Sequence, residues 1–286
     1  METNGSIQSS GKFLIWSVCF GWECRRLAGY WLTSLLQIGH WTQDIVLLGD
    51  HRILSLRHPQ LRTFEIVKDL ERKYSFPRKR WTVMTCQNWK PEIQFYVDLR
   101  QYDYILFLDL DVLINSDRLE QLIKSKWQRN KICIQRDIVK ILADRVWTGR
   151  DILTSEEKTR WANEAICSGI VGAPTNEWGL ALLKDWHDLN KKGKFRKSEQ
   201  ANLIALLLRD YIEKWEYIGD SMIGRVRRYD ETLIHFSARN YELFRTYYQR
   251  VLHLPEPEGP RLTSFSTRFD WFRRKVDWFT RRLAWF

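Results

Sequence analysis

The chain has 286 residues, of which 44% are hydrophobic and 28% charged, and its formal net charge is +11. This length and composition are typical of one globular domain with a short appendage, and they exclude a disordered chain and a polytopic membrane protein. The positive charge favours anionic partners, but no RNP-like motif, zinc-finger spacing or arginine-rich arm accompanies it, so we expect phosphorylated substrates or lipid and no nucleic acid.

The first part of the chain alternates strands and helices. After a polar leader, residues 1–11, the sequence predicts a strand at Lys12–Gly21, a helix at Glu23–Ile38 and a strand at Asp44–Gly49. A strand, a helix and a strand in close succession are typical of a parallel α/β sheet. In such a sheet, we expect a nucleotide site at the carboxyl ends of the strands.

The middle of the chain continues this pattern. Strands are predicted at Trp81–Cys86, Tyr104–Leu108 and Lys131–Gln135, and a helix opened by a proline at Pro91–Gln101. The segment Tyr104–Leu108 is almost continuously apolar, which indicates a central position in the sheet. The charged stretch 137–164 is expected to be helical or looped and to face solvent.

The last part of the domain predicts helices at 180–190 and 199–215 and a short strand at Leu233–Phe236. Residues 12–254 are therefore expected to form one α/β domain, with a mostly parallel central sheet flanked by helices.

A linker and a basic tail follow this domain. Prolines and a glycine at 255–261 interrupt all periodicity, and residues 262–286 form a separate tryptophan-rich tail. Tryptophans recur there every seven residues, at Trp271, Trp278 and Trp285. On a helix they would share an apolar face with most of the arginines opposite, which suits an anionic membrane surface. The alternatives are packing on the domain or a coiled-coil contact, although two heptads are few for the latter.

The tail hypothesis, which assigns membrane contact to residues 265–286, predicts the effect of a deletion. Removing residues 261–286 is expected to release the protein from anionic vesicles, because the basic and aromatic side chains would be gone, while the function of the domain 12–254 stays intact. Vesicle co-sedimentation checks this, and binding that the deletion does not change would contradict it.

The cysteines indicate a reducing compartment. There are five, an odd number, with no Cys-x-x-Cys pair, at Cys19, Cys24, Cys86, Cys133 and Cys167. The apolar run from Phe13 to Phe20 is too short to span a bilayer, and its leader lacks the basic start of a signal peptide. We expect a cytoplasmic protein that is peripheral on the inner face of the membrane.

Two aspartates follow the apolar strand Tyr104–Leu108. Asp109 and Asp111 are two residues apart, so in extended backbone their side chains would project from one face, about 7 Å apart. Two carboxylates suit Mn²⁺ or Mg²⁺, which would act as a Lewis acid toward a departing nucleoside diphosphate. The triplet alone also fits a strand end capped by solvated acids, but its apolar surroundings favour a metal site.

Asp109 and Asp111 belong to one of four segments that we compare with known motifs: Tyr102–Ile114, Cys167–Pro174, Ser198–Leu203 and Leu233–Ser237. These segments resemble those of GT-A-fold glycosyltransferases of family eight, the glycogenin and lipopolysaccharide sugar transferase group. Their order and spacing match over residues 12 to about 240. The resemblance implies a GT-A (Rossmann-like) fold and a retaining hexosyl transfer to a glycan or lipid-linked acceptor. It favours a UDP-sugar as donor, with a GDP-sugar as the alternative.

The resemblance also implies roles for individual residues. His235 would be the third metal ligand beside Asp109 and Asp111, and Glu199 and Gln200 would line the donor sugar at the reaction centre. The residues implied in donor binding are Cys19, Phe20, Gly21, Asp50, Leu110, Ser168, Gly169 and Arg239.

The chain departs from the family pattern at four places. The loop Cys19-Phe20-Gly21-Trp22 stands where a polar or aromatic pair that binds the base is usual, so this loop leaves the base of the donor open. Cys167 stands where asparagine is usual, and Glu199 where aspartate is usual. A Gly-x-Lys-Pro run that contacts the diphosphate is replaced by Ala238-Arg239-Asn240, so Arg239 is expected to supply the charge from another backbone position.

Simpler roles fit some of these residues. His235 on an apolar strand could be a core histidine, Glu199 could be a helix N-terminal acid that stabilises the dipole, and Asp50 could only form a turn.

Two other functions fit part of the sequence. A haloacid-dehalogenase-like phosphohydrolase also has an apolar strand ending in Asp-x-Asp, and Ile218–Ser221 is similar to its late acidic motif. This chain lacks the second late acid of that motif, however. In the hydrolases the aspartates would follow the first strand, whereas here Asp109 and Asp111 follow a later one. A non-catalytic, membrane-associated nucleotide-sugar-binding protein is the third hypothesis, against which the intact Asp109, Asp111 and His235 argue.

Overall fold

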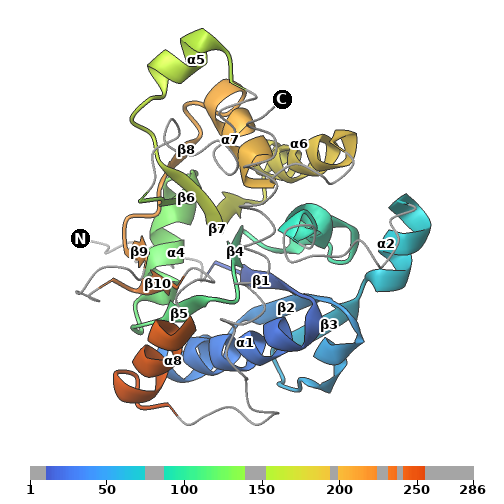
Figure 1. Cartoon of the computed structure of the whole chain (residues 1–286), viewed down its shortest axis with the longest axis vertical. Coiled ribbons are helices and arrows are strands. Elements are labelled where there is room, and N and C mark those ends of the chain that lie inside the picture. Colours follow the sequence, from blue (N-terminus) through green and yellow to red (C-terminus); the bar gives the residue numbers. More distant parts are fainter. Residues whose placement is uncertain are drawn as a thin grey trace, which may run out of the picture.

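A seven-stranded sheet forms the centre of the protein, with helices on both of its faces and a small three-stranded sheet beside it (Figure 1). The computed structural model describes residues 11–74, 87–138, 153–193, 199–223, 231–236 and 241–254. Residues 1–10 of the polar leader, the predicted strand Trp81–Cys86, residues 139–152 of the charged stretch, the linker and the tail lie outside the described residues.

The large sheet is mixed but mostly parallel. Its strands are β1 (Phe13–Cys19), β2 (Asp44–Gly49), β3 (Leu61–Glu65), β4 (Tyr104–Leu108), β6 (Ile132–Arg136), β7 (Ile166–Pro174) and β8 (Trp215–Tyr217). They lie in the order β3-β2-β1-β4-β7-β6-β8. Only β7 among these seven runs against its neighbours, pairing antiparallel with both β4 and β6. The carboxyl ends of β2, β1 and β4 therefore lie side by side at one edge of the sheet.

The small sheet carries a late segment of the chain back to the end of β4. It consists of β5 (Val112–Ile114), β9 (Ser221–Ile223) and β10 (Leu233–His235), in the order β5-β10-β9. Strand β10 pairs antiparallel with β5, so that His235 lies opposite Val112. This pairing brings His235 next to the residues that follow β4.

Helices lie around the two sheets (Figure 1). They are α1 (Gly21–Thr33), which continues as a π-helical turn (Ser34–Ile38), α2 (Val67–Tyr74), α4 (Leu119–Gln128), α5 (Ser155–Arg160), α6 (Glu177–Lys192), α7 (Glu199–Arg209) and α8 (Tyr241–Arg250). Short 3₁₀ helices lie at η2 (His51–Ser55), η4 (Lys90–Phe95) and η5 (Leu99–Gln101).

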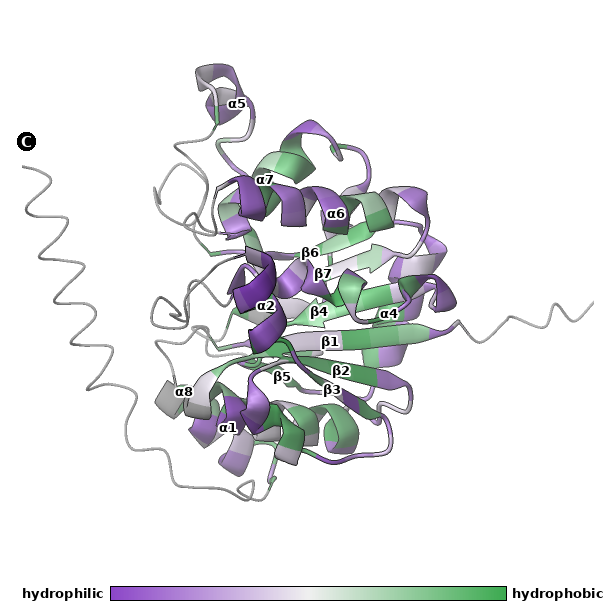
Figure 2. Ribbon diagram, turned by 90° about the vertical axis from the view of Figure 1, so that its right-hand side faces the viewer, coloured by the Kyte–Doolittle hydropathy of each residue, from purple (hydrophilic) through white to green (hydrophobic). Residues whose placement is uncertain are grey.

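The apolar core follows from the alternation of side chains along the strands. In β1, Leu14 and Trp16 are buried on one face and Phe13 and Ile15 on the other. The first face packs against α6 and α7, and the second against α1 and α4. Figure 2 shows the hydrophobic strands between helices whose outer surfaces are hydrophilic. Because the sheet is buried on both faces, the carboxyl ends of β1, β2 and β4 are held in place relative to one another.

A third apolar cluster holds the small sheet against α1. The rings of Tyr30 on α1 and Tyr248 on α8 meet edge to face with centroids 4.6 Å apart, and Phe236, just after β10, packs against Phe244. This packing anchors the strand that carries His235.

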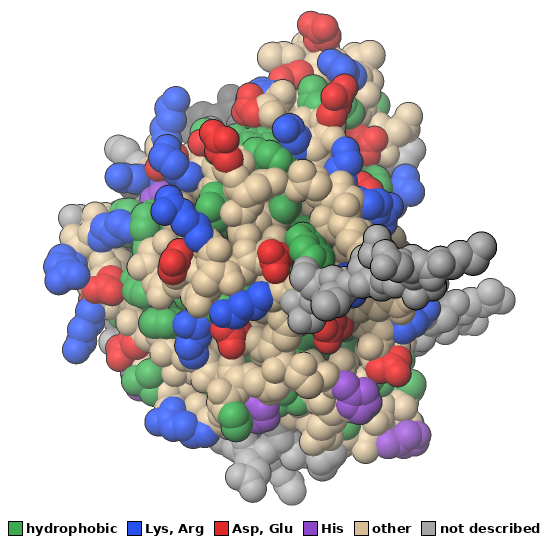
Figure 3. Space-filling view, turned by 180° about the vertical axis from the view of Figure 1, so that it is seen from behind, with side chains coloured by type: hydrophobic (Ala, Val, Ile, Leu, Met, Phe, Trp, Pro, Cys, Tyr) green, Lys and Arg blue, Asp and Glu red, His purple; other side chains and the backbone are tan. Residues whose placement is uncertain are grey.

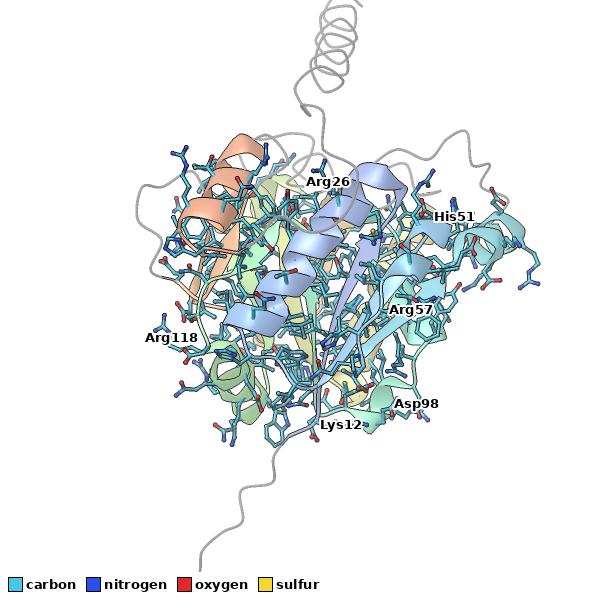
Figure 4. The ribbon with its side chains drawn as sticks, turned by 90° about the horizontal axis from the view of Figure 1, so that it is seen from below. Lys12, Arg26, His51, Arg57, Asp98 and Arg118 are labelled. Atoms are coloured by element: carbon cyan, nitrogen blue, oxygen red, sulfur yellow. The ribbon has the colours of Figure 1, made fainter. Side chains whose placement is uncertain are left out.

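The residues that flank β1 and β2 lie at opposite ends of the molecule. Figure 4 places Lys12, just before β1, and Asp98 at one end of the molecule, and Arg26 and His51, just after β1 and β2, at the other. On the face drawn in Figure 3, the described Lys and Arg side chains are spread among Asp and Glu and form no single basic patch.

Within the described ranges, no helix has the length and apolarity needed to cross a membrane.

Several sequence predictions need correction. The segment Pro91–Gln101 is not one helix, because η4 ends near Tyr96 and the Asp98 carboxylate then accepts a hydrogen bond from the Arg100 N–H and begins a new turn. The helix predicted at 199–215 ends at Arg209, after which the chain turns into β8.

Candidate metal and donor site

The two aspartates lie in a turn at the carboxyl end of β4. The Asp109 N–H donates a hydrogen bond to the Gly169 carbonyl at 2.8 Å, which extends the pairing of β4 with β7 by one residue. The Val112 N–H then donates to the Asp109 carbonyl at 3.0 Å and closes the turn into β5. The extended backbone that the sequence spacing suggested for Asp109 and Asp111 is therefore wrong, and the turn decides where the two carboxylates point.

His235 completes a cluster of three groups that can bind a metal. Its Nε2 lies 3.2 Å from Asp111 Oδ1. One ligand atom each from Asp109, Asp111 and His235 lies within 4.8 Å of the others. Two carboxylate oxygens and an imidazole nitrogen are a donor set that Mn²⁺ accepts. The residues present thus fit the ion that the sequence resemblance implied.

Gly169 on β7 leaves room for this cluster. A Cβ at Gly169 would lie 2.3 Å from His235 Cε1 and 3.1 Å from Asp109 Oδ2. The histidine ring therefore packs directly against bare backbone, and any side chain at this position would clash with the ring. The glycine is required by a close approach and not by its backbone conformation.

Lys90 connects the aspartates to a third acid, and sequence reasoning missed it. The side chain is fully buried, and its Nζ lies 2.9 Å from Glu199 Oε1 and 3.3 Å from Asp109 Oδ1. It also donates to the Ser168 carbonyl at 3.1 Å. Burial lowers the pKa of Lys90, but the carboxylates of Asp109 and Glu199 outweigh burial and raise it above its usual value. The lysine is therefore a permanent cation between two acids.

Glu199 and Gln200 begin helix α7 and are bound to β7. Ser168 Oγ donates to Glu199 Oε1 at 2.9 Å, and the Ser168 N–H donates to Gln200 Oε1 at 3.1 Å. Trp186 Nε1 donates to the Glu199 carbonyl at 2.9 Å. Both side chains are buried. Four segments of the resemblance thus meet around Ser168, Asp109 and His235.

The loops after β1 and β2 are tied together by Asp50. Its carboxylate accepts a hydrogen bond from the Gly21 N–H at 2.8 Å and pairs with Arg52 Nη1 at 2.6 Å. Gly21 has a φ of +89°, which favours glycine at this turn. Cys19 and Phe20 are buried beside it. Asp50 therefore shapes the loop expected to bind the donor.

Of the other residues implied in donor binding, Leu110 does not offer its side chain to a ligand. The Leu110 side chain is buried in the apolar cluster between the sheet and α1, so only its backbone remains for a ligand. Arg239 lies outside the described residues.

The late acid of the phosphohydrolase hypothesis has a structural role. Asp220 Oδ1 accepts a hydrogen bond from the Thr232 N–H at 3.0 Å, and its Oδ2 lies 3.4 Å from Arg118 Nη2. These contacts join β9 to β10 and α4.

Two of the three candidate ligands have raised pKa values, so protons compete with a metal ion for them. Burial raises the pKa of Asp109 to about 6, against the opposing effect of the Lys90 ammonium. Burial on its own lowers the pKa of His235, but the Asp111 carboxylate outweighs it and brings this pKa well above its usual value. A metal ion must displace these protons to bind.

Protons and a metal ion compete for Asp109 and His235, so metal binding is predicted to depend on pH. Both groups have raised pKa values in the fold, so they stabilise the metal-free protein at low pH and this contribution is lost as pH rises. A bound divalent ion replaces it, and each displaced proton changes the affinity by up to about tenfold per pH unit. We expect Mn²⁺ to raise the melting temperature more at pH 8 than at pH 6, measured against EDTA. An equal increase at both pH values would contradict this.

Comparisons with known proteins establish the fold. No protein-family model matches the chain, and no curated protein matches it by sequence. The galactosyltransferase LgtC, in a complex with donor and acceptor sugar analogues, matches with a TM-score of 0.52 at 10% identity, over 82% of this chain and 95% of that one. Mouse xyloside xylosyltransferase 1 matches with a TM-score of 0.53 at 10% identity, over 80% and 99%.

A third structure extends the comparison. The bifunctional glycosyltransferase WbbM matches with a TM-score of 0.55 at 14% identity, over 84% of this chain and 50% of that one. At such identities the likeness concerns the fold alone. The α/β GT-A fold with a mostly parallel sheet, expected from the sequence, is thereby confirmed.

Proposed function

We propose that this chain is a divalent-metal-dependent, retaining glycosyltransferase that moves a hexosyl unit from a nucleotide-diphosphate sugar to a glycan or lipid-linked acceptor. A UDP-sugar is the favoured donor. The observation that carries the proposal is the meeting of Asp109, Asp111 and His235 at the carboxyl end of β4, beside Glu199 and Gln200. The names of the similar structures, a galactosyltransferase and a xylosyltransferase, support it.

The proposed metal site would be formed by Asp109, Asp111 and His235. Their donor set would hold a divalent ion, which would supply positive charge to a departing diphosphate. The three candidate ligands lie at the carboxyl end of β4. In open α/β sheets, ligands bind beyond the carboxyl ends of the strands, which agrees with this position.

The chain's own residues would position the sugar. Ser168 Oγ and Lys90 Nζ both contact Oε1 of the Glu199 carboxylate, at 2.9 Å each, which fixes it at the start of α7. Gln200 is fixed by its hydrogen bond from the Ser168 N–H. Because these groups are already ordered, little reorganisation is needed when the donor binds. Their burial also limits the access of water, which would otherwise compete with the acceptor.

The place of action is a further part of the proposal. A cytoplasmic protein on the inner face of the membrane agrees with the scattered cysteines and with the basic, tryptophan-rich composition of residues 265–286.

A donor screen tests the proposed function. The full-length protein is incubated with UDP-sugars and GDP-sugars, with Mn²⁺ or with EDTA, and release of UDP or GDP is measured. Release that requires the metal supports the transferase, and transfer to a glycan or lipid-linked acceptor identifies the second substrate. Metal-dependent release of phosphate from phosphomonoesters would instead support the hydrolase. Release of neither product would favour a binding protein.

A further inference from the structure

Gln135 contacts the face of His235 that points away from the aspartates. It lies on β6, its side chain is fully buried, and its Oε1 is 2.7 Å from His235 Nδ1. The Cys167 Sγ is also near this nitrogen, but at 3.8 Å. The glutamine is thus the closer polar partner of the ring nitrogen that does not face Asp111.

An irregularity in the large sheet places Gln135 there. Ile134 pairs with Val171 on β7, but the next residue, Gln135, pairs with Cys167. Three residues of β7, Ser168 to Ile170, are therefore left out of the ladder with β6. Such irregularities often redirect a side chain beside a functional site. Here the same irregularity frees Ser168 for Glu199, leaves Gly169 against the histidine ring and directs Gln135 toward His235.

The hydrogen bond determines which ring nitrogen carries a proton. An amide oxygen only accepts hydrogen bonds, so the Nδ1 that contacts Gln135 Oε1 must donate. In a neutral imidazole the other nitrogen, Nε2, then has its lone pair available. That nitrogen lies 3.2 Å from Asp111 Oδ1, on the side of the candidate metal site.

We propose that Gln135 is a positioning residue that holds His235 as its Nδ1–H tautomer and presents Nε2 to a divalent cation. The inference rests on the proposed function, because it needs the cation site of Asp109, Asp111 and His235. Partners of this kind commonly fix the orientation and tautomer of histidine ligands.

A neutral partner suits the charge of this site. Asp109, Asp111 and Glu199 contribute three negative charges when ionised, and Lys90 contributes one positive charge, so the sum is −2. A divalent cation balances this sum. A carboxylate at position 135 would hold the same tautomer but would leave one buried negative charge uncompensated.

The first experiment measures Mn²⁺ binding without any donor, by electron paramagnetic resonance on the full-length protein. Gln135→Leu removes the acceptor at similar volume and is expected to weaken Mn²⁺ binding by about 10- to 100-fold. Gln135→Glu keeps an acceptor and is expected to retain binding within about tenfold of wild type. The matched control is Gln43→Leu, which removes the glutamine acceptor of the N–H of Phe13, the first residue of β1, at the amino end of that strand. This control should leave Mn²⁺ affinity unchanged.

A second measurement does not depend on the folding of any variant. In wild-type protein labelled with ¹⁵N-histidine and loaded with Mg²⁺, the nitrogen spectrum of His235 should show the proton on Nδ1. A proton on Nε2 would overturn the inference, as would Mn²⁺ affinity in Gln135→Leu equal to that of wild type. A wild-type protein that binds neither cation would refute the metal site itself, and with it both the proposed function and this inference.

Discussion

Replacing Asp109 or Asp111 with alanine is expected to abolish metal-dependent turnover while the protein remains folded. Each substitution removes one of three groups whose ligand atoms lie within 4.8 Å of one another. A metal ion contributes several kcal/mol to transition-state stabilisation, so the rate should fall on the order of 10³-fold or more. Release of nucleoside diphosphate in the presence of Mn²⁺ measures this, and thermal unfolding checks the fold.

The control for this prediction is an aspartate with no contact to the site. Asp188 on α6 pairs with Lys184 at 3.0 Å, and its side chain is 53% exposed. Asp188→Ala should therefore keep wild-type turnover. Full activity in either Asp109→Ala or Asp111→Ala would refute the proposed site.

Replacing Lys90 with methionine is expected to reduce both stability and turnover. The fully buried ammonium pairs with Asp109 and Glu199, and methionine has a similar length without charge. Removing one partner of a buried ion pair leaves an uncompensated charge, which typically costs about 3–5 kcal/mol. The free energy of unfolding, from denaturant titration without metal, measures the loss. Turnover should fall as well, because Glu199 would lose one of the two groups that hold it.

A second substitution separates charge from packing in this prediction. Adding Glu199→Gln to Lys90→Met removes one of the unpaired carboxylates, so the double variant should recover part of the lost stability. Lys184→Met on the surface of α6, whose pair with Asp188 is exposed, should leave the unfolding free energy unchanged. If Lys90→Met unfolded at the same denaturant concentration as wild type, the lysine would not stabilise the buried acids.

The parts of the fold that the sequence predicted are those with a strong local pattern. The apolar run Tyr104–Leu108 coincides with β4, and Asp44–Gly49 coincides with β2. Strand β7 was recognised only as a motif, because Ile166–Pro174 contains small residues and no alternation of polar and apolar side chains. Its antiparallel direction depends on how β4 and β6 pair with it, which no local pattern encodes.

The candidate site shows the same division. Asp109 and Asp111 were found because they follow a strand, and His235 because of the resemblance. Lys90 was missed because a lysine beside a proline indicates an exposed helix start, and its burial is explained only by acids 19 and 109 residues further along the chain. Gln135 was missed for the same reason, since its partner His235 is 100 residues away.

The pairing of β10 with β5 has a consequence for the order in which the site is made. A nascent chain that has been synthesised through β7 already contains both aspartates, Lys90 and Gly169, but not the histidine that completes the ligand set. Closing so long a loop is slow compared with local steps, so the small sheet is expected to join late. High-affinity uptake of a divalent cation would then coincide with the completion of folding. A prematurely terminated chain would carry the acidic turn at the end of β4 with only two of the three candidate ligands.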